Sequence, residues 1–153
     1  MKSYSALHIF NDRERILLAR AARLVRKVKD PGAENKESPD IIRCHELARA
    51  VGKVLDLRYI DGKFGFIDHT WLLTFQKTGD KDNILDVYAV GSLPMVILVN
   101  ASYLTLSHHK LYTPGRRPRS DIKQDVVDSL VEQMLSEYQH LTKIGDKSIG
   151  REG

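Results

Sequence analysis

The sequence predicts a single α+β domain, in which an antiparallel sheet packs against a central helix and against flanking helices from both ends of the chain. Three observations favour this class. Apolar residues recur at helical spacing near both ends and once between them, aromatic and β-branched residues gather mid-chain, and short turn-forming segments separate these runs. At 153 residues the chain has the length of one domain with one hydrophobic core.

The first expected helix runs from Asp12 to about Lys29, with Asn11 as its N-cap and apolar side chains at helical spacing along one face. The second begins at Ser38 and Pro39, because serine caps helices well and proline suits the first helical position. Its apolar stripe consists of Ile41, Cys44, Ala48, Val51 and Leu55. The single cysteine of the chain is therefore expected to face the core or the sheet.

Strand patterns begin directly after this helix. We expect a hairpin of Leu57–Ile60 and Lys63–Phe75 around the turn signal Asp61-Gly62. A short polar turn then leads into Asn83–Val90. Because so short a connection permits only a tight turn, this strand is expected to pair antiparallel with the long strand before it.

Two further strands and a last helix complete the expected fold. Met95–Val99 is a continuous apolar run typical of a buried strand, and Tyr103–Tyr112 alternates well enough to be its neighbour. Ser120 caps the last helix, with which the domain of residues 1–142 ends. Residues 143–153 are expected to be a flexible tail.

Composition and charge exclude several classes of protein. The hydrophobic fraction of 42% and the charged fraction of 29% are those of a globular chain rather than a disordered or fibrous one. The net charge is only +4. The basic residues concentrate in Arg13–Lys29 and Lys110–Lys123, apart from most of the aromatic residues, so we do not expect nucleic-acid binding.

The sequence also bears on the compartment. No run approaches the roughly 20 apolar residues of a membrane span, and Met1–Phe10 lacks the layout of a secretory signal. A single cysteine cannot form an internal disulfide, so nothing indicates an oxidising compartment. We expect a cytoplasmic protein with no membrane partner and no cofactor, whose thiol is either core filler or a nucleophile.

Three residues from separate segments have complementary chemistry. Cys44 lies in the central helix, His69 lies in the long strand within His69-Thr70-Trp71, and Asp86 lies in the strand after it. A free thiol is mostly protonated at neutral pH, so a catalytic cysteine needs an imidazole that holds the thiolate and a carboxylate that orients the imidazole. These residue types predict a catalytic triad of Cys44, His69 and Asp86.

The chain order of this triad resembles that of the transglutaminase-like and papain-like cysteine enzymes. The resemblance covers about Ser38–Pro94, and its positions are a cysteine on a helix, a His-x-Trp on the next long strand and an aspartate on the following strand. The matching residues here are Cys44, His69-x-Trp71 and Asp86. The resemblance implies acyl transfer by a thiol nucleophile on an α+β domain.

The alternation of side chains along strands allows the triad to converge. If an even number of loop residues joins the two strands, His69 and Asp86 lie on one face, and directly opposed side chains there have Cβ atoms about 4.5 to 5.5 Å apart. We expect the central helix to pack on this face and to bring Cys44 over His69. Trp71 shares the face and is expected to wall the site, exclude water and contact the substrate.

Other interpretations of these residues must be weighed. A lone cysteine on an apolar helix stripe is often core filler. The zinc-protease pattern HExxH is excluded, because Arg49 stands where its second histidine is required. The remaining candidate zinc ligands lack the usual paired spacing, so no metal site is expected; they are Cys44, His45, His69, His108 and His109.

The sequence thus predicts that a Cys44 thioester mediates hydrolysis of a peptide or isopeptide bond, or deamidation of glutamine, in a protein or peptide substrate. Amine cross-linking is less favoured, because nothing marks a site for an amine acceptor. The Cys44 backbone N–H is the expected oxyanion donor. The alternative is a non-catalytic protein-interaction module on the same fold, which binds a partner through the basic loop around Arg116 to Arg119 or through the first helix.

Overall fold

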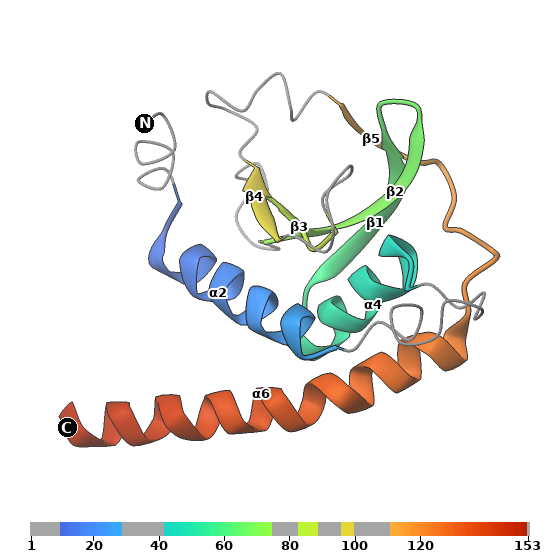
Figure 1. The fold of residues 1–153 in the computed structure, drawn as a ribbon. Helices are drawn as coiled ribbons and strands as arrows, with labels where there is room; N and C mark the ends of the chain where they lie inside the picture. The colour runs from blue at the N-terminus through green and yellow to red at the C-terminus, as the bar shows by residue number, and fades with distance from the viewer. Residues whose placement is uncertain (1–9, 29–41, 75–82, 89–95, 100–110, 153) are drawn as a thin grey trace.

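The computed structural model describes residues 10–28, 42–74, 83–88, 96–99 and 111–152 (Figure 1). Its helices are α2 (Asp12–Lys27), α4 (Cys44–Leu55) and α6 (Gln124–Glu152). Its strands are β1 (Arg58–Phe64), β2 (Ile67–Leu73), β3 (Ile84–Asp86), β4 (Ile97–Val99) and β5 (Tyr112–Pro114). The strands form one antiparallel sheet in the order β4-β3-β2-β1-β5. The predicted α+β class, with helices flanking an antiparallel sheet, is confirmed.

The first hairpin differs from the prediction in the position of its turn. Asp61 and Gly62 lie inside β1, where Gly62 pairs with His69, and the turn lies at Gly65 and Phe66. Gly65 has φ 60°, a conformation that glycine adopts at little cost. The prediction of a turn at Asp61-Gly62 is therefore wrong. Both residues have roles inside the sheet, as the site geometry below shows.

The remaining strands fit the prediction in part. β3 pairs antiparallel with β2, as expected for the strands that carry Asp86 and His69, and it also pairs antiparallel with β4, a pairing that was not predicted. Tyr112, expected beside the Met95–Val99 strand, instead begins β5, which pairs with β1. The rest of the predicted strand before Tyr112 lies outside the described residues.

The boundaries of α2 follow simple capping rules. Asn11 is the N-cap, as predicted; its side chain accepts a hydrogen bond from the Glu14 backbone, and the Glu14 side chain accepts one from the Asn11 backbone. Glu14 is buried and also accepts a hydrogen bond from Thr74 Oγ1 at 2.9 Å and one from the Asn83 side chain. The start of α2 is thereby fixed to the ends of β2 and β3.

Two other helix boundaries differ from the prediction. α4 begins at Cys44, with Arg43 as its N-cap in an extended conformation, so the cysteine is the first helical residue rather than a residue of the second turn. The predicted cap at Ser38 lies outside the described residues. α6 begins at Gln124 and continues through the predicted tail to Glu152. No proline interrupts this segment, so nothing forces the helix to end near residue 142.

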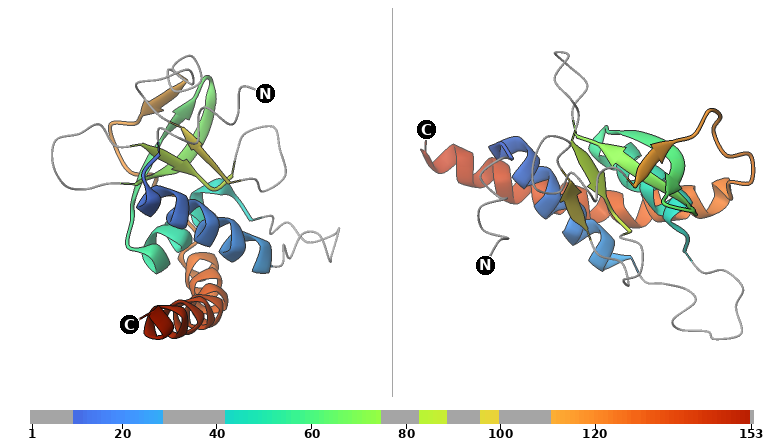
Figure 2. Two further views of the ribbon diagram at one scale, coloured as in Figure 1. Left: turned by 90° about the vertical axis from the view of Figure 1, so that its left-hand side faces the viewer. Right: turned by 90° about the horizontal axis from the view of Figure 1, so that it is seen from above.

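All three described helices lie on one side of the sheet (Figures 1 and 2). α2 and α4 lie nearest to the sheet, and α6 runs along them on the far side. The core between these layers is apolar, and its most buried members include Leu24, Leu47, Val51, Leu72, Leu85 and Met134. None of the described helices combines the length and apolar character that crossing a bilayer requires.

The other face of the sheet carries a smaller apolar cluster of Trp71, Ile84, Val99 and Tyr112. Along β2, Thr70 and Leu72 contact the helix layer, so alternation directs His69 and Trp71 to the opposite face. The prediction that α4 packs on the His69 face is therefore wrong. Both faces of β2 are apolar enough to be buried, so the alternation of side chains did not indicate which face the helices cover.

Candidate active site

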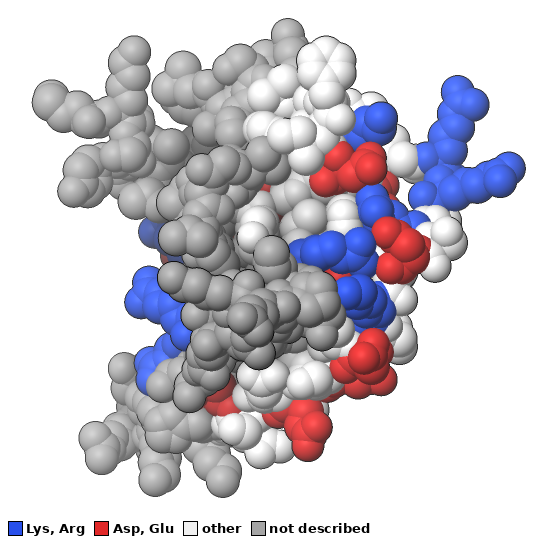
Figure 3. Space-filling model, turned by 45° about the vertical axis from the view of Figure 1, so that its right-hand side comes forward, with Lys and Arg blue, Asp and Glu red and all other residues white. Residues whose placement is uncertain are grey.

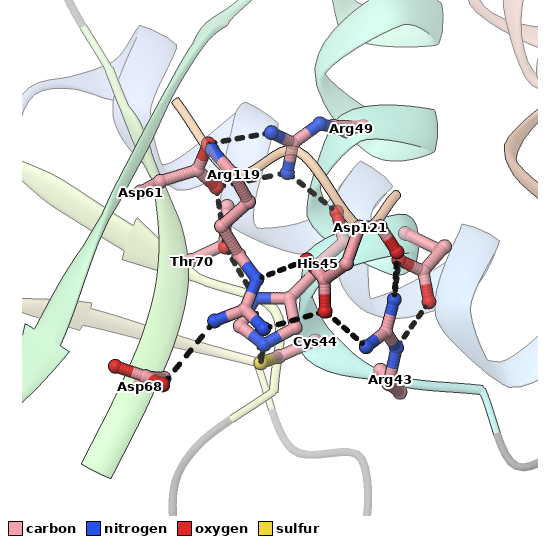
Figure 4. A network of polar contacts seen from close by, with 10 residues as sticks. Arg43, Cys44, His45, Arg49, Asp61, Asp68, Thr70, Arg119 and Asp121 are labelled. Atoms are coloured by element: carbon pink, nitrogen blue, oxygen red, sulfur yellow. Dashed lines mark hydrogen bonds and ion pairs between the residues drawn. The ribbon is translucent and has the colours of Figure 1, made fainter. Parts of the chain in front are cut away.

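Cys44 occupies the first position of α4 and is partly exposed. The first helical hydrogen bond runs from the Leu47 N–H to the Arg43 carbonyl at 3.0 Å, and the Arg43 side chain makes no capping bond to the helix backbone. The N–H groups of the first turn thus lie next to the thiol, at the end of the helix dipole that favours negative charge. Figure 4 shows Cys44 at this end of α4, level with the part of β2 between Asp68 and Thr70.

His69 and Asp86 are joined across neighbouring strands. The His69 Nε2 lies 2.7 Å from Asp86 Oδ2, and both side chains are buried. Asp86 also accepts hydrogen bonds from the Tyr112 hydroxyl at 2.7 Å and from the Tyr88 backbone N–H at 3.0 Å. An ionised carboxylate can only accept, so His69 donates from Nε2. Its other nitrogen, Nδ1, is left as the proton acceptor.

The strand register explains this pairing. Leu72 of β2 pairs with Leu85 of β3. Continued by one residue, this register sets Asp86 opposite Trp71 and therefore diagonal to His69. The prediction that His69 and Asp86 share a face on neighbouring strands is confirmed, although they are diagonal rather than directly opposed. A diagonal pair remains within reach of a long side chain such as histidine.

The Cys44 thiol and the His69 ring change each other's pKa, although α4 packs on the other face of the sheet. Burial raises the pKa of the Cys44 thiol, but hydrogen bonds to His45 and His69 and the positive charge of these rings outweigh it and lower the pKa to about 6. The structure thus joins His69 to Asp86 directly, whereas the ring in direct contact with the Cys44 sulfur is that of His45.

The pKa of His69 changes in the opposite direction. Burial lowers it, but the hydrogen bond to Asp86, the contact with Cys44 and the charges of both partners raise it to about 9. Between these two values the pair favours a thiolate beside an imidazolium. The Tyr112 pKa is also raised, by burial and by the Asp86 charge, so its hydroxyl stays protonated and donates to Asp86.

Trp71, predicted to contact the substrate, is only 2% exposed. Its ring stacks near the His69 ring, with centroids 6.3 Å apart and an interplanar angle of 29°, and meets Tyr112 edge-on at 5.2 Å. In this structure the ring supports the orientation of His69 and Tyr112, and it leaves little surface for a substrate.

A second polar network reaches the thiol from the helix side of the sheet (Figure 4). His45 contacts Cys44 and bonds to Thr70, Thr70 donates to Asp61, and Asp61 forms an ion pair with Arg49. Sequence reasoning missed these roles. Asp61 resembled a turn residue beside glycine, and the one available signal was that His45 directly follows the cysteine.

A segment before α6 fastens the start of α4. Arg43 bonds to Glu46 through Nε and Nη2, at 2.6 and 2.8 Å, and its Nη1 lies 3.1 Å from Asp121 Oδ2. Arg119 binds Asp121 at 2.8 and 2.9 Å and approaches Asp68 of β2 at 3.4 Å. These ion pairs join α4, β2 and the segment between β5 and α6 around the Cys44 end of the helix.

Described side chains of both charges lie on the surface near this segment. Among the described residues, Figure 3 shows basic and acidic side chains interleaved on the face that Figure 1 shows at the right, without a broad region of one sign. A nucleic-acid surface requires contiguous basic residues. The expectation of no nucleic-acid partner stays a prediction, and this surface does not argue against it.

The same side chains also bear on metal binding. Among the described side chains, no three of histidine, cysteine, aspartate or glutamate are grouped in a way that could hold a metal ion. His108 and His109 lie outside the described residues. His69 uses Nε2 for Asp86, and His45 uses Nδ1 for Thr70, so both rings are oriented by protein partners.

Comparison of the chain with protein-family models, curated proteins and solved structures finds no match in any of the three. The functional assignment therefore depends on the geometry of the site.

Proposed function

We propose that this protein is a cysteine-dependent enzyme that transfers an acyl group from an amide to water, with Cys44 as nucleophile. One observation carries the proposal. The Asp86 carboxylate holds His69 through Nε2 at 2.7 Å, which leaves Nδ1 for the thiol, and the Cys44 pKa is lowered to about 6. A core-filling cysteine needs neither an oriented imidazole nor a lowered pKa.

In the first step, the Cys44 thiolate attacks the carbonyl carbon of the amide, and the carbonyl π-electrons move to the oxygen. The Cys44 backbone N–H, at the first position of α4, serves as the oxyanion donor. The His69 imidazolium then gives its Nδ1 proton to the leaving nitrogen as the C–N bond breaks. The products are a free amine or ammonia and a thioester on Cys44.

In the second step, water attacks the thioester, and neutral His69 takes one of its protons. The C–S bond breaks, the acid is released and the thiolate returns beside the imidazolium. Asp86 keeps His69 in the same tautomer throughout. Peptide or isopeptide hydrolysis and glutamine deamidation share this path, and amine cross-linking replaces water by an amine. We favour water as acceptor, and a protein or peptide as substrate.

The proposal extends the resemblance to transglutaminase-like and papain-like enzymes, which rests on the order of Cys44, His69-x-Trp71 and Asp86. We also propose a reducing compartment such as the cytoplasm, because a thiol nucleophile must stay free to react.

Alkylation of the native protein tests the proposal directly, because a label on the single cysteine must be on Cys44. Iodoacetamide should label Cys44 rapidly at pH 7 in the folded protein, detected by intact mass. His69→Ala should slow this reaction by moving the pKa of the thiol toward its ordinary value of 9.0. Turnover is measured as cleavage of unstructured protein and as ammonia released from glutamine peptides. Labelling only in denaturant would overturn the proposal.

A second candidate function is the non-catalytic interaction module. A pocket between β1 and the loop after β5 is lined in part by Tyr59, Pro114, Arg116 and Arg117, and both arginines are exposed. Arg119, by contrast, is held by Asp68 and Asp121. An acidic peptide is the partner that such a pocket would attract. A protein that binds acidic peptides and whose Cys44 resists alkylation until unfolding would favour this function.

A further inference from the structure

His45 is a buried imidazole that contacts the proposed nucleophile. Cys44 Sγ lies 3.6 Å from His45 Nδ1 and 3.9 Å from Nε2, so the sulfur is nearly equidistant from both ring nitrogens. The ring is only 6% exposed. Consecutive residues on a helix point in directions about 100° apart, so this contact requires the ring to turn back toward the thiol.

A chain of hydrogen bonds holds the ring in that position. His45 Nδ1 lies 2.7 Å from Thr70 Oγ1, and Thr70 Oγ1 lies 2.7 Å from Asp61 Oδ1. The Asp61 carboxylate only accepts, so the single hydroxyl proton of Thr70 is directed to it, and the hydroxyl oxygen must accept from His45. The His45 Nδ1 therefore carries a proton, and the ring is fixed in one tautomer and one orientation.

Ion pairing anchors the far end of this hydrogen-bond chain, which is the Asp61 carboxylate. Arg49 donates to both oxygens of Asp61, at 2.8 and 2.5 Å, and the Arg119 backbone N–H donates to Asp61 Oδ2 at 3.1 Å. Burial raises the pKa of Asp61, and its bonds to Arg49 and Thr70 lower it by more. Because Arg49 already balances the negative charge of Asp61, the hydrogen-bond chain serves mainly to orient His45 rather than to add a proton to it.

We propose that His45 is a second catalytic imidazole, which Thr70, Asp61 and Arg49 hold against the Cys44 thiol. The inference rests on the proposed function and deepens it. His69 exchanges the proton of the reaction. Because the Nδ1 proton is donated to Thr70, His45 stabilises the thiolate in its imidazolium form through Nε2, which lies 3.9 Å from Sγ, and Thr70 and Asp61 are positioning residues that act through it.

Charged groups around Cys44 and His45 come from each described element that packs against these two residues. A test of pH dependence must leave these groups in place. They are Arg43, Glu46 and Arg49 of the α4 region, Asp61 and Asp68 of the hairpin, His69 and Asp86 across the sheet, and Arg119 and Asp121 before α6. Substitution of Thr70 alters none of these charges, so it isolates the positioning of His45.

The experiment follows the rate of Cys44 alkylation by iodoacetamide between pH 5 and 10 in the full chain. We compare wild type with His45→Phe, Thr70→Val, Thr70→Ser and His69→Ala, with the exposed Thr113→Val as matched control. His45→Phe and Thr70→Val should raise the midpoint of the profile, whereas Thr70→Ser, which keeps the hydroxyl, and Thr113→Val should not. At a pH below the midpoints of both wild type and variant, each pH unit by which the midpoint rises lowers the alkylation rate about tenfold.

The outcomes separate the inference from the proposed function. If His69→Ala raises the midpoint while folded His45→Phe and Thr70→Val leave it unchanged, the inference is wrong and the proposed function stands. If wild-type Cys44 alkylates with the ordinary midpoint of 9.0 and no variant changes it, the proposed function is wrong as well. Circular dichroism identifies folded variants, and should His45→Phe not fold, the Thr70→Val and Thr70→Ser pair decides alone.

Discussion

The His69 Nε2 lies 2.7 Å from Asp86 Oδ2, so a hydrogen bond between two adjacent strands decides which nitrogen of His69 is left to accept a proton. Tyr112 from β5 donates to the same oxygen at 2.7 Å. The carboxylate is thus held from β2 and from β5, and from the Tyr88 backbone. The orientation of the imidazole consequently depends on the whole sheet rather than on one pair of side chains.

Asp86→Asn should separate the orientation of His69 from the reactivity of the thiol. An asparagine amide can donate to Nε2, which moves the histidine proton to Nδ1 and removes the base that faces Cys44. We expect turnover to fall by about 10²- to 10⁴-fold, while Cys44 remains open to alkylation. Asp125→Asn, an exposed position on α6, is the matched control. A folded Asp86→Asn protein with unchanged turnover would refute the triad.

The coupled thiol and imidazole also make a prediction about stability and pH. The raised pKa of His69 contributes stability that is present below its ordinary value of 6.5 and is lost as the pH rises through about 9. The lowered pKa of Cys44 contributes stability that is present above its ordinary value of 9.0 and is lost as the pH falls through about 6. The two contributions to the free energy of unfolding therefore change with pH in opposite directions over nearly the same pH range.

Between pH 6.5 and 9 the folded and unfolded chains therefore each hold one proton on this pair, on His69 when folded and on Cys44 when unfolded. We expect the free energy of unfolding, measured with urea, to stay nearly constant over this window. A slope near 1.4 kcal/mol per pH unit, the value for one proton exchanged on unfolding, would show that the proton does not pass between the two residues. Alkylation, by contrast, should change strongly near pH 6.

Local patterns in the sequence sufficed to predict part of this structure. The cap at Asn11 depends on a short-range pattern, and the shared face of His69 and Asp86 depends only on the period of two along strands. Such features need no knowledge of the tertiary fold. The end of the cysteine helix near Leu55 and the antiparallel pairing of the His69 and Asp86 strands could be predicted for the same reason.

Other features depended on contacts between distant segments. Asp61 has the local pattern of a turn, but its carboxylate is satisfied by Arg49 and Thr70, and it lies within a strand. The start of α4 at Cys44 coincides with ion pairs of Arg43 to Glu46 and Asp121. Long-range partners of this kind cannot be identified from periodicity in one sequence.

Leu85→Ala tests whether stability and catalysis can be separated on β3. Leu85 is fully buried in the core between the sheet and the helices, next to Asp86 but on the opposite face. Loss of its side chain should lower the free energy of unfolding by about 2 to 5 kcal/mol, without removing any group of the triad. Leu135→Ala, at a position that is 43% exposed, should cost much less. Equal losses for the two variants in urea unfolding would contradict the assigned core.

Gly62→Ala should disturb the site through the backbone. Gly62 of β1 lies so close to β5 that an added Cβ would be 2.2 Å from the Thr113 carbonyl oxygen and 2.7 Å from the Trp71 ring. Neither group has room to yield: one belongs to the β1–β5 pairing, and the other is buried beside His69. We expect β5 to move away from β1 and to carry the Tyr112 hydroxyl away from Asp86.

The expected cost of Gly62→Ala is about 1 to 3 kcal/mol, typical of overpacking, together with a fall in turnover that Gly65→Asn does not share. Gly65 has φ 60°, where asparagine is tolerated, and its added Cβ would meet open space. Urea unfolding gives the stability of both variants, and turnover on the substrate found for wild type gives their activity. If Gly62→Ala matches wild type in both, β5 does not approach β1 as closely as described, and Tyr112 cannot be assigned to hold Asp86.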